Sequence, residues 1–269
     1  MRLRDWLWPV LGASAGLLTY GCLYAANRLV LERRTIRLRG WPASLNGLKI
    51  AVLADLHIRD EYSVALGQRA VEMALDAGPD MVVLPGDLVA YWKPETPWLL
   101  EQVLEPLTLM RGSCIATPGN REYWEGLPEL LVPVLDTFEI KFLKNEVWRH
   151  AGVQWVGLDS ANLGQPTPIE TMKKVQPDAP TIVLWHEPDV VESLPAGADF
   201  MISGHSHGGQ FRTPWGWAPM KTKNGVKYLD GYYPDAPTPL YVSRGIGTTG
   251  PPSRLNCPPE VSVLEVYGT

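Results

Sequence analysis

Five short polar motifs each follow an apolar run of the chain, and their residue types are those that bind divalent metals. The motifs are DLH at 55–57, GD at 86–87, GNRE at 119–122, WHEP at 185–188 and GHSHGGQ at 204–210. Carboxylate, imidazole and carboxamide groups suit borderline-hard cations such as manganese, iron and zinc, and none of the motifs contains a thiolate. The motifs therefore predict a metal site that could activate water.

Spacing and histidine usage both bear on this prediction. On an extended segment, side chains two residues apart point the same way, so DLH and GHSH would each present two ligands to one metal or to two. Taken singly, a histidine after a strand is more often an ordinary surface residue, and a GD pair is usually a turn. The chain has five histidines, and four of them lie in the motifs: His57, His186, His205 and His207. Only His150 lies outside, where we expect a solvated side chain.

The apolar runs before the motifs predict the elements that position them. Buried strands are expected at 48–53, 81–84, 114–116, 154–158, 181–184, 200–203 and 240–243, and a last strand at 261–266 is expected to close the sheet edge. A helix at 65–77 lies between the first two strands and ends at Gly78-Pro79. The polar residues thus gather at the carboxyl ends of strands, where open α/β sheets bind ligands.

The ordered series DLH, GD, GNRE, WHEP and GHSHGGQ resembles the calcineurin-like metallophosphoesterase superfamily over residues 48–266. The resemblance implies an α/β fold, a four-layer αββα sandwich of two mixed β-sheets flanked by helices, within a domain at 45–269. It also implies two divalent metal ions, taken from manganese, iron and zinc with manganese favoured, which make hydroxide available for attack on phosphorus.

The same resemblance assigns the ligands. The first metal would be held by Asp55, His57, Asp87 and His207. Asp87 would bridge to the second metal, whose other ligands would be Asn120, His186 and His205. Asp87 and His205 are also expected to take part in catalysis, together with Arg121.

Arg121 departs from the family pattern, which usually has histidine after GN. An arginine stays protonated and cannot act as a general acid, but it can clamp a phosphate through two hydrogen bonds. A phosphate leaving group needs no proton, so Arg121 favours a phosphoanhydride, or a diester with a good leaving group. In the alternative interpretation Arg121 only pairs with Glu122 or Glu125.

The GNR motif is similar to that of the UDP-2,3-diacylglucosamine hydrolases of lipid A synthesis, which makes a pyrophosphatase for that lipid the best single candidate. However, too few residues separate His186 from His205 for the lipid-binding insertion of those enzymes. GHSHGGQ and the segment SRGIG at 243–247 resemble the membrane-associated phosphodiesterase branch instead. A general membrane phosphodiesterase acting on phospholipid headgroups is therefore the alternative enzyme, and a non-catalytic metal-bound interaction module is the alternative from another class. An apolar rim could form from Tyr91, Trp92, Trp98, Trp215 and Trp217, although local packing is favoured.

The N-terminal segment 6–26 carries no charge, and about 20 apolar residues suffice to cross a bilayer. We predict a retained transmembrane helix, and residues 1–44 are interpreted as this anchor with a basic linker. Two arginines precede the segment and five follow it, which predicts a single-pass protein of the inner membrane with a cytoplasmic catalytic domain. The net charge of -5 argues against a nucleic-acid partner. The three scattered cysteines predict no disulfide framework.

Overall fold

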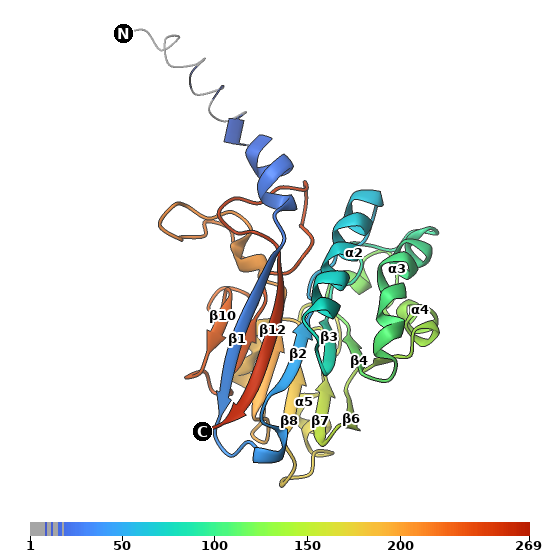
Figure 1. Ribbon diagram of the computed structural model, residues 1–269, viewed down its shortest axis with the longest axis vertical. Helices are drawn as coiled ribbons and strands as arrows, with labels where there is room; N and C mark the ends of the chain where they lie inside the picture. The colour runs from blue at the N-terminus through green and yellow to red at the C-terminus, as the bar shows by residue number, and fades with distance from the viewer. Residues whose placement is uncertain (1–8, 10–11, 13–15, 18) are drawn as a thin grey trace.

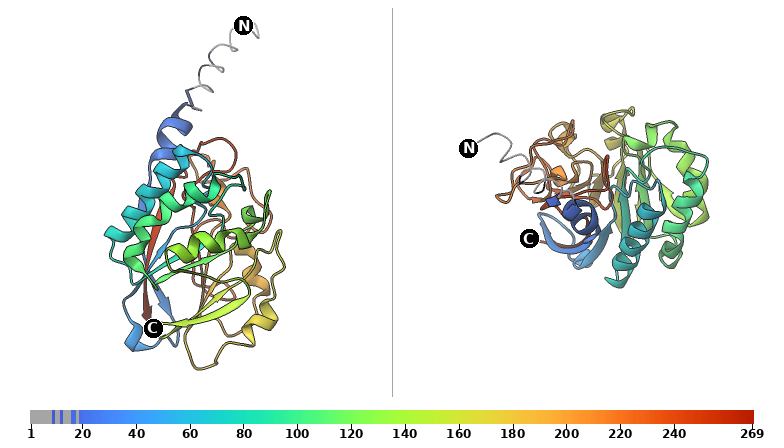
Figure 2. Two further views of the ribbon diagram at one scale, coloured as in Figure 1. Left: turned by 90° about the vertical axis from the view of Figure 1, so that its right-hand side faces the viewer. Right: turned by 90° about the horizontal axis from the view of Figure 1, so that it is seen from above.

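The computed structural model describes residues 9, 12, 16–17 and 19–269 (Figure 1). Two six-stranded mixed sheets lie face to face. Their strand orders are β1-β12-β2-β3-β4-β5 and β10-β11-β9-β8-β7-β6. The views in Figure 2 show the longer helices together on the outer face of the first sheet. The predicted α/β architecture of two mixed sheets flanked by helices is confirmed.

The first sheet contains β1 (Val30–Leu38), β2 (Leu48–Val52), β3 (Met81–Pro85), β4 (Cys114–Thr117), β5 (Ile140–Phe142) and β12 (Glu260–Gly268). The second contains β6 (Glu146–His150), β7 (Val153–Gly157), β8 (Thr181–Leu184), β9 (Phe200–Ser203), β10 (Gly231–Tyr233) and β11 (Leu240–Val242). The α-helices are α2 (Glu61–Asp76), α3 (Thr96–Leu104), α4 (Val132–Thr137) and α5 (Pro168–Met172). Each predicted strand and the predicted helix has a counterpart here, whereas β1, β5, β6 and β10 were not predicted.

Alternate residues of the central strands belong to different hydrophobic cores. In β2, Ala51 belongs to the core shared with helices α2 and α3, whereas Ile50 and Val52 belong to the core between the sheets. A third core, with Val183 and Met201, covers the outer face of the second sheet. Because both faces of these strands are covered, their sequences are continuous apolar runs, which is why they were predictable.

The edge of the first sheet differs from the prediction. The last strand, β12, is an inner strand: it pairs antiparallel with β2 and parallel with β1. β1 forms the edge instead, and it lies in the stretch interpreted as a basic linker. Ile36 and Leu38 are buried while Arg33, Arg34 and Arg37 are exposed, so the arginines belong to an edge strand that is partly open to solvent.

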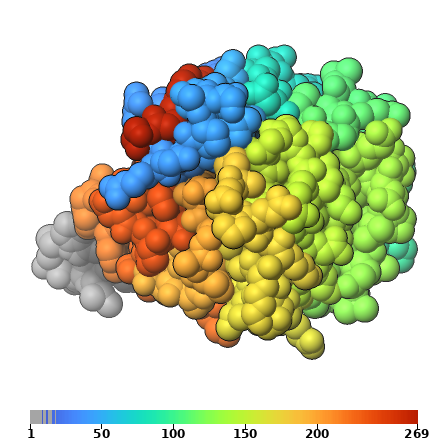
Figure 3. Space-filling view, turned by 90° about the horizontal axis from the view of Figure 1, so that it is seen from below, coloured from blue at the N-terminus to red at the C-terminus, as the bar shows by residue number. Residues whose placement is uncertain are grey.

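The N-terminal segment enters the domain at the end where β1 begins (Figure 1). Its described part includes the short helical turns η1 (Tyr20–Tyr24) and η2 (Ala25–Asn27). Part of the predicted transmembrane segment 6–26 lies outside the described residues. Within the described part of the chain, none of the helices combines the length and apolar character needed to cross a bilayer. Figure 3 shows the opposite end of the molecule, where the blue, yellow and green parts of the chain lie side by side.

Candidate metal centre

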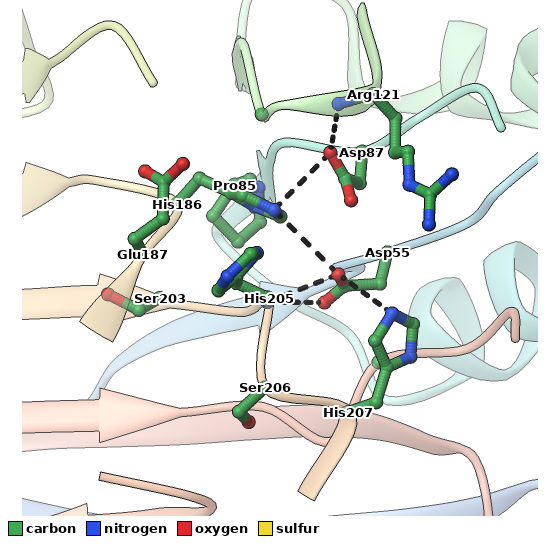
Figure 4. Close-up of polar contacts among 12 residues, drawn as sticks. Asp55, Pro85, Asp87, Arg121, His186, Glu187, Ser203, His205, Ser206 and His207 are labelled. Carbon is green, nitrogen blue, oxygen red and sulfur yellow. Dashed lines mark hydrogen bonds and ion pairs between the residues drawn. The ribbon is translucent and has the colours of Figure 1, made fainter. Parts of the chain in front are cut away.

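The five motifs meet at one end of the two sheets. Strands β2, β3 and β4 are parallel neighbours, and so are β8 and β9, so their carboxyl ends share an edge. Asp55, Asp87 and Asn120 follow strands of the first sheet, and His186 and the GHSH histidines follow strands of the second. Figure 4 shows the side chains of Asp55, Asp87, His186, His205 and His207 turned toward one another.

Six of these side chains form two groups, each with the geometry to hold one metal ion. One group is Asp55, His57 and His207, and the other is Asp87, His186 and His205; the ligand atoms of each lie within 4.8 Å of one another. The groups adjoin, because His57 Nε2 lies 3.5 Å from Asp87 Oδ2 and His186 Nε2 lies 3.3 Å from Asp87 Oδ1. Asp87, a member of the second group, therefore also adjoins the first group.

The backbone at these ligands is not extended, which corrects the expectation from the two-residue spacing. The φ angles are 52° at Asp55, 49° at His57, 53° at Asp87, 68° at His205 and 51° at His207. Residues other than glycine seldom adopt this left-handed region, and such strain clusters at functional sites. The turn after each strand, and not a pleated alternation, aims these side chains. It also sends His205 and His207 to different groups.

Hydrogen bonds between the turns hold this backbone in place. The Asp55 N–H donates to the Gly86 carbonyl at 3.2 Å, and the His57 N–H donates to the Asp87 carbonyl at 3.0 Å. The His205 N–H donates to the Asp55 carboxylate at 3.0 Å. Gly86 has a φ of 90°, and a Cβ there would lie 2.6 Å from His186 Nδ1. Only glycine lets these turns approach so closely.

The far nitrogens of several histidines are also fixed. His186 Nδ1 lies 2.7 Å from the Pro85 carbonyl, and His205 Nε2 lies 2.8 Å from the Lys223 carbonyl. A histidine that donates one ring N–H to a carbonyl presents the other nitrogen as a lone pair, which is the usual arrangement of metal-binding histidines. His57 Nε2 and His207 Nε2 converge to 3.0 Å of each other.

Burial sets the charge of these groups. Burial lowers the pKa of His57 to about 3, against the opposing charge of Asp87 and with help from Arg121. Burial, with the nearby His57 and Arg254, holds the pKa of His207 well below its usual range. Burial likewise raises the pKa of Asp55 to about 7, although the electrostatic effect of the nearby His186 opposes it. His57 and His207 are therefore neutral near pH 7, the form in which histidine binds a metal.

Asn120 adds an observation that fits a cation. Its Oδ1 atom is buried and has no hydrogen-bond partner among the described residues. A buried carbonyl oxygen without a partner is costly, and a divalent ion would supply one. The set of aspartate, histidine and asparagine is suited to manganese, iron or zinc, so the residues fit the two ions that the sequence predicted.

Comparison with known proteins gives the family. The family model for calcineurin-like phosphoesterases matches residues 48–209, more than half of the chain. The chain belongs to the calcineurin-like phosphoesterase family.

An uncharacterized metallophosphoesterase of Helicobacter pylori is 32% identical over 81% of this chain, and the chain spans only 60% of that relative. The phosphodiesterase YaeI of Escherichia coli is 30% identical, covering 81% of this chain and 82% of that protein. The UDP-2,3-diacylglucosamine pyrophosphatase LpxG of Chlamydia muridarum is 26% identical, covering 88% of this chain and 89% of that protein. The chain is thus a metal-dependent phosphoesterase.

Arg121 lies beside the metal groups of this phosphoesterase. Its backbone N–H donates to Asp87 Oδ1 at 2.8 Å (Figure 4). Its guanidinium stacks on the ring of Trp124 at 3.9 Å. The side chain is partly exposed. Arg121 forms no ion pair with Glu122 or Glu125, all three being described residues, so the alternative interpretation of Arg121 has no support.

Two buried residues of the phosphoesterase site were missed by the sequence analysis. Glu122 accepts hydrogen bonds from the N–H groups of Asp87, Val89 and Gly119, and so ties the GD turn to the GNRE turn. Its place in the GNRE motif was a signal, but it was considered only as a partner for Arg121. Arg254 is fully buried, donates to the carbonyls of Gly245 and Gly247, and lies 3.4 Å from His207 Nδ1. No motif marks it.

His150 lies outside the site, as expected. However, its side chain is half-buried and not fully solvated, which corrects the expectation, because its ring stacks on Trp148 at 4.4 Å.

Proposed function

We propose that this phosphoesterase hydrolyses a phosphodiester or pyrophosphate bond in a lipid or nucleotide substrate at the inner surface of a membrane. The observation that carries the proposal is the pair of adjoining three-residue groups, one of which contains Asp87, with the Arg121 side chain beside them. The best single candidate substrate is UDP-2,3-diacylglucosamine, the substrate in the name of the 26% identical relative LpxG.

In this proposal the chain's ligands have separate tasks. Asp55, His57 and His207 would hold one ion, Asn120, His186 and His205 would hold the other, and Asp87 would serve both. When bound, two divalent ions, with manganese favoured, supply charge neutralisation for the phosphate and a nucleophilic hydroxide at neutral pH. The hydrogen bonds between the turns hold the ligands in advance, so little reorganisation is needed when the ions and the substrate bind.

The chemistry of Arg121 supports a leaving group that needs no proton. The Trp124 ring holds the guanidinium, which keeps its five N–H donors for an oxygen-rich ligand. No proton can be supplied from this position, so a leaving group that is already a weak base is favoured. The departing phosphate of a pyrophosphate meets that requirement, and a simple alkoxide does not.

One observation favours the alternative, a general membrane phosphodiesterase. The stretch between His186 and His205 is described throughout and contains only the short turn η7 (Pro188–Ser193) and strand β9. A lipid-binding insertion at this place, which the UDP-2,3-diacylglucosamine hydrolases have, is absent from this stretch. Acyl chains would then have to use another surface. A non-catalytic module is the weakest alternative, because the ligand set is complete.

The substrate class can be tested directly. Purified full-length protein would be incubated with UDP-2,3-diacylglucosamine, other nucleotide pyrophosphates and phospholipids, each with manganese, iron and zinc. Release of UMP from the UDP-lipid is expected. Hydrolysis of phospholipid headgroups alone would establish the alternative, and no hydrolysis with any metal would favour the non-catalytic module.

The location is a separate part of the proposal. Residues 6–26 would anchor the chain, and the domain at 45–269 would lie in the cytoplasm. A reporter that is active only in the periplasm, fused after Thr269, should give no signal. A strong signal would place the domain outside and remove cytoplasmic UDP-sugars from the candidates.

A further inference from the structure

Two exposed apolar segments lie side by side at the end of the molecule that carries the metal centre. One is the N-terminal segment, with Leu23 74% and Tyr24 54% exposed. The other is the loop at 213–220, here called the Trp loop, with Trp215 78%, Trp217 58% and Met220 59% exposed. Figures 1 and 2 both show the orange loop region beside the blue N-terminal turns. Large apolar side chains gathered in this way mark an interaction surface.

A shared groove lies between the two segments, and the N-terminal segment also packs against the chain at 253–254. The groove is apolar and has a volume of about 520 Å³, with Leu17 and Tyr20 on one wall and Phe211, Pro214 and Pro219 on the other. The Arg254 N–H donates to the Gly21 carbonyl at 3.2 Å. A Cβ on Gly21 would lie 2.5 Å from Ser253 Oγ, so η1 is packed closely against the chain that supports His207.

The Trp loop has an ordered backbone. The N–H of Thr213 donates to the Trp217 carbonyl at 2.9 Å, and the N–H of Gly216 donates to the Thr213 carbonyl at 2.9 Å. The Trp217 N–H also donates to Thr213 Oγ1 at 3.0 Å. A closed turn of this kind holds the exposed indoles in place before any partner binds, which reduces the entropy lost on binding.

Charge and position identify the partner as a lipid bilayer. The uncharged stretch at 6–26 contains the exposed residues Leu23 and Tyr24. Exposed Lys221 and Lys223 follow the Trp loop, where they would meet anionic headgroups. Tryptophan beside lysine is the composition of protein surfaces at the membrane interface.

We propose that the Trp loop is a second membrane contact, which inserts Trp215, Trp217 and Met220 into an anionic bilayer surface beside the N-terminal segment. The contact holds the metal centre next to the lipid, because the loop begins three residues after the GHSHGGQ motif and a small cavity is lined by both His207 and Met220. This inference rests on the membrane attachment in the proposed function.

The test uses the full-length protein in vesicles of phosphatidylcholine and phosphatidylglycerol, with and without brominated acyl chains that quench tryptophan. Flotation first shows whether the wild type is attached. Substitution of Trp215→Phe with Trp217→Phe should remove part of the quenched fluorescence. Trp98→Phe is the matched control: Trp98 is 61% exposed on α3, away from the Trp loop, and its substitution should remove none.

A second measurement compares two substrates in the same variants. Trp215→Ser with Trp217→Ser should lower hydrolysis of a vesicle-borne phosphodiester by about 10-fold, since two aromatic contacts with the bilayer are lost, and should leave a soluble aryl phosphodiester unchanged. Trp98→Ser should change neither rate. If the wild type floats but tryptophan quenching is the same in the Trp loop variant and the Trp98 variant, this inference is wrong and the membrane attachment stands. Failure of the wild type to float would overturn the membrane attachment and the inference with it.

Discussion

The metal centre and the surface around it are built on opposite principles. The ligands are buried at strand ends, and hydrogen bonds between neighbouring turns fix their backbone, as at Asp55 and His205. The surrounding surface consists of loops and the N-terminal segment, with Trp215 and Trp217 exposed. The comparison suggests that the buried part determines the reaction and the exposed part determines where the enzyme works and on which substrate. Substitutions in the two parts should therefore differ in size and in kind.

The largest effect is expected at Asp87, which belongs to one metal group and adjoins the other. Asp87→Ala should lower activity by about 10³-fold or more, because a ligand shared by two ions is lost. Asn120→Ala should act in the same direction through the second group. Circular dichroism should show a retained fold, since neither residue belongs to the apolar cores. Asp76→Ala, an exposed aspartate at the end of α2, is the matched control and should keep full activity.

Arg121 lies where the two parts meet, and its effect should depend on the substrate. Arg121→Ala should reduce pyrophosphate cleavage by about 10²-fold, because a charge-assisted contact contributes about 2 to 3 kcal/mol. An activated aryl phosphodiester has no second phosphate to clamp and should lose much less. Arg121→His should shift preference toward alkyl esters, whose leaving groups need a proton. Equal losses on both substrates would show that Arg121 is structural.

A substitution of Glu122 tests whether the hydrogen bonds between the turns are needed to position the metal ligands. In the wild type, backbone N–H groups of both turns donate to the Glu122 carboxylate. Glu122→Gln replaces one acceptor oxygen with an N–H₂ group, which cannot accept from these donors, so the GD turn should shift. Activity and metal affinity should fall by roughly 10-fold, the lower end of what lost support of a metal ligand costs. The neighbouring Glu125 is exposed, and Glu125→Gln should leave both unchanged. Unchanged metal affinity in Glu122→Gln would show that the ligands do not need this support.

The smallest effect is expected on the exposed surface. Trp217→Ala should change the free energy of unfolding by less than about 0.5 kcal/mol, as is usual for surface substitutions. Trp92 is the contrasting residue: it is buried and donates from Nε1 to the Glu122 carbonyl at 2.8 Å. Trp92→Ala should cost about 3 to 5 kcal/mol in a denaturant titration. Similar losses for the two would contradict the distinction between packed and exposed aromatic residues.

The sequence predicted the buried part better than the exposed part for physical reasons. Strands such as β3 are covered on both faces, so their runs are apolar throughout and easily recognised. β1 was taken for a linker because exposed arginines interrupt its apolar pattern, and the expected place of β12 at the sheet edge followed from the same error. The left-handed turns at Asp55 and His57 were not foreseen, because their conformation depends on bonds to a neighbouring strand end. Arg254 was missed because it contacts His207 from a distant loop.

The most direct test of the central claim is the metal content of the purified protein. Inductively coupled plasma mass spectrometry after mild purification should give close to two ions per chain. Removal of these ions with a chelator should abolish phosphodiester hydrolysis, and manganese should restore it, because the paired groups around Asp87 have no other source of a nucleophilic hydroxide. Full activity in chelator-treated protein that contains no metal would contradict the account.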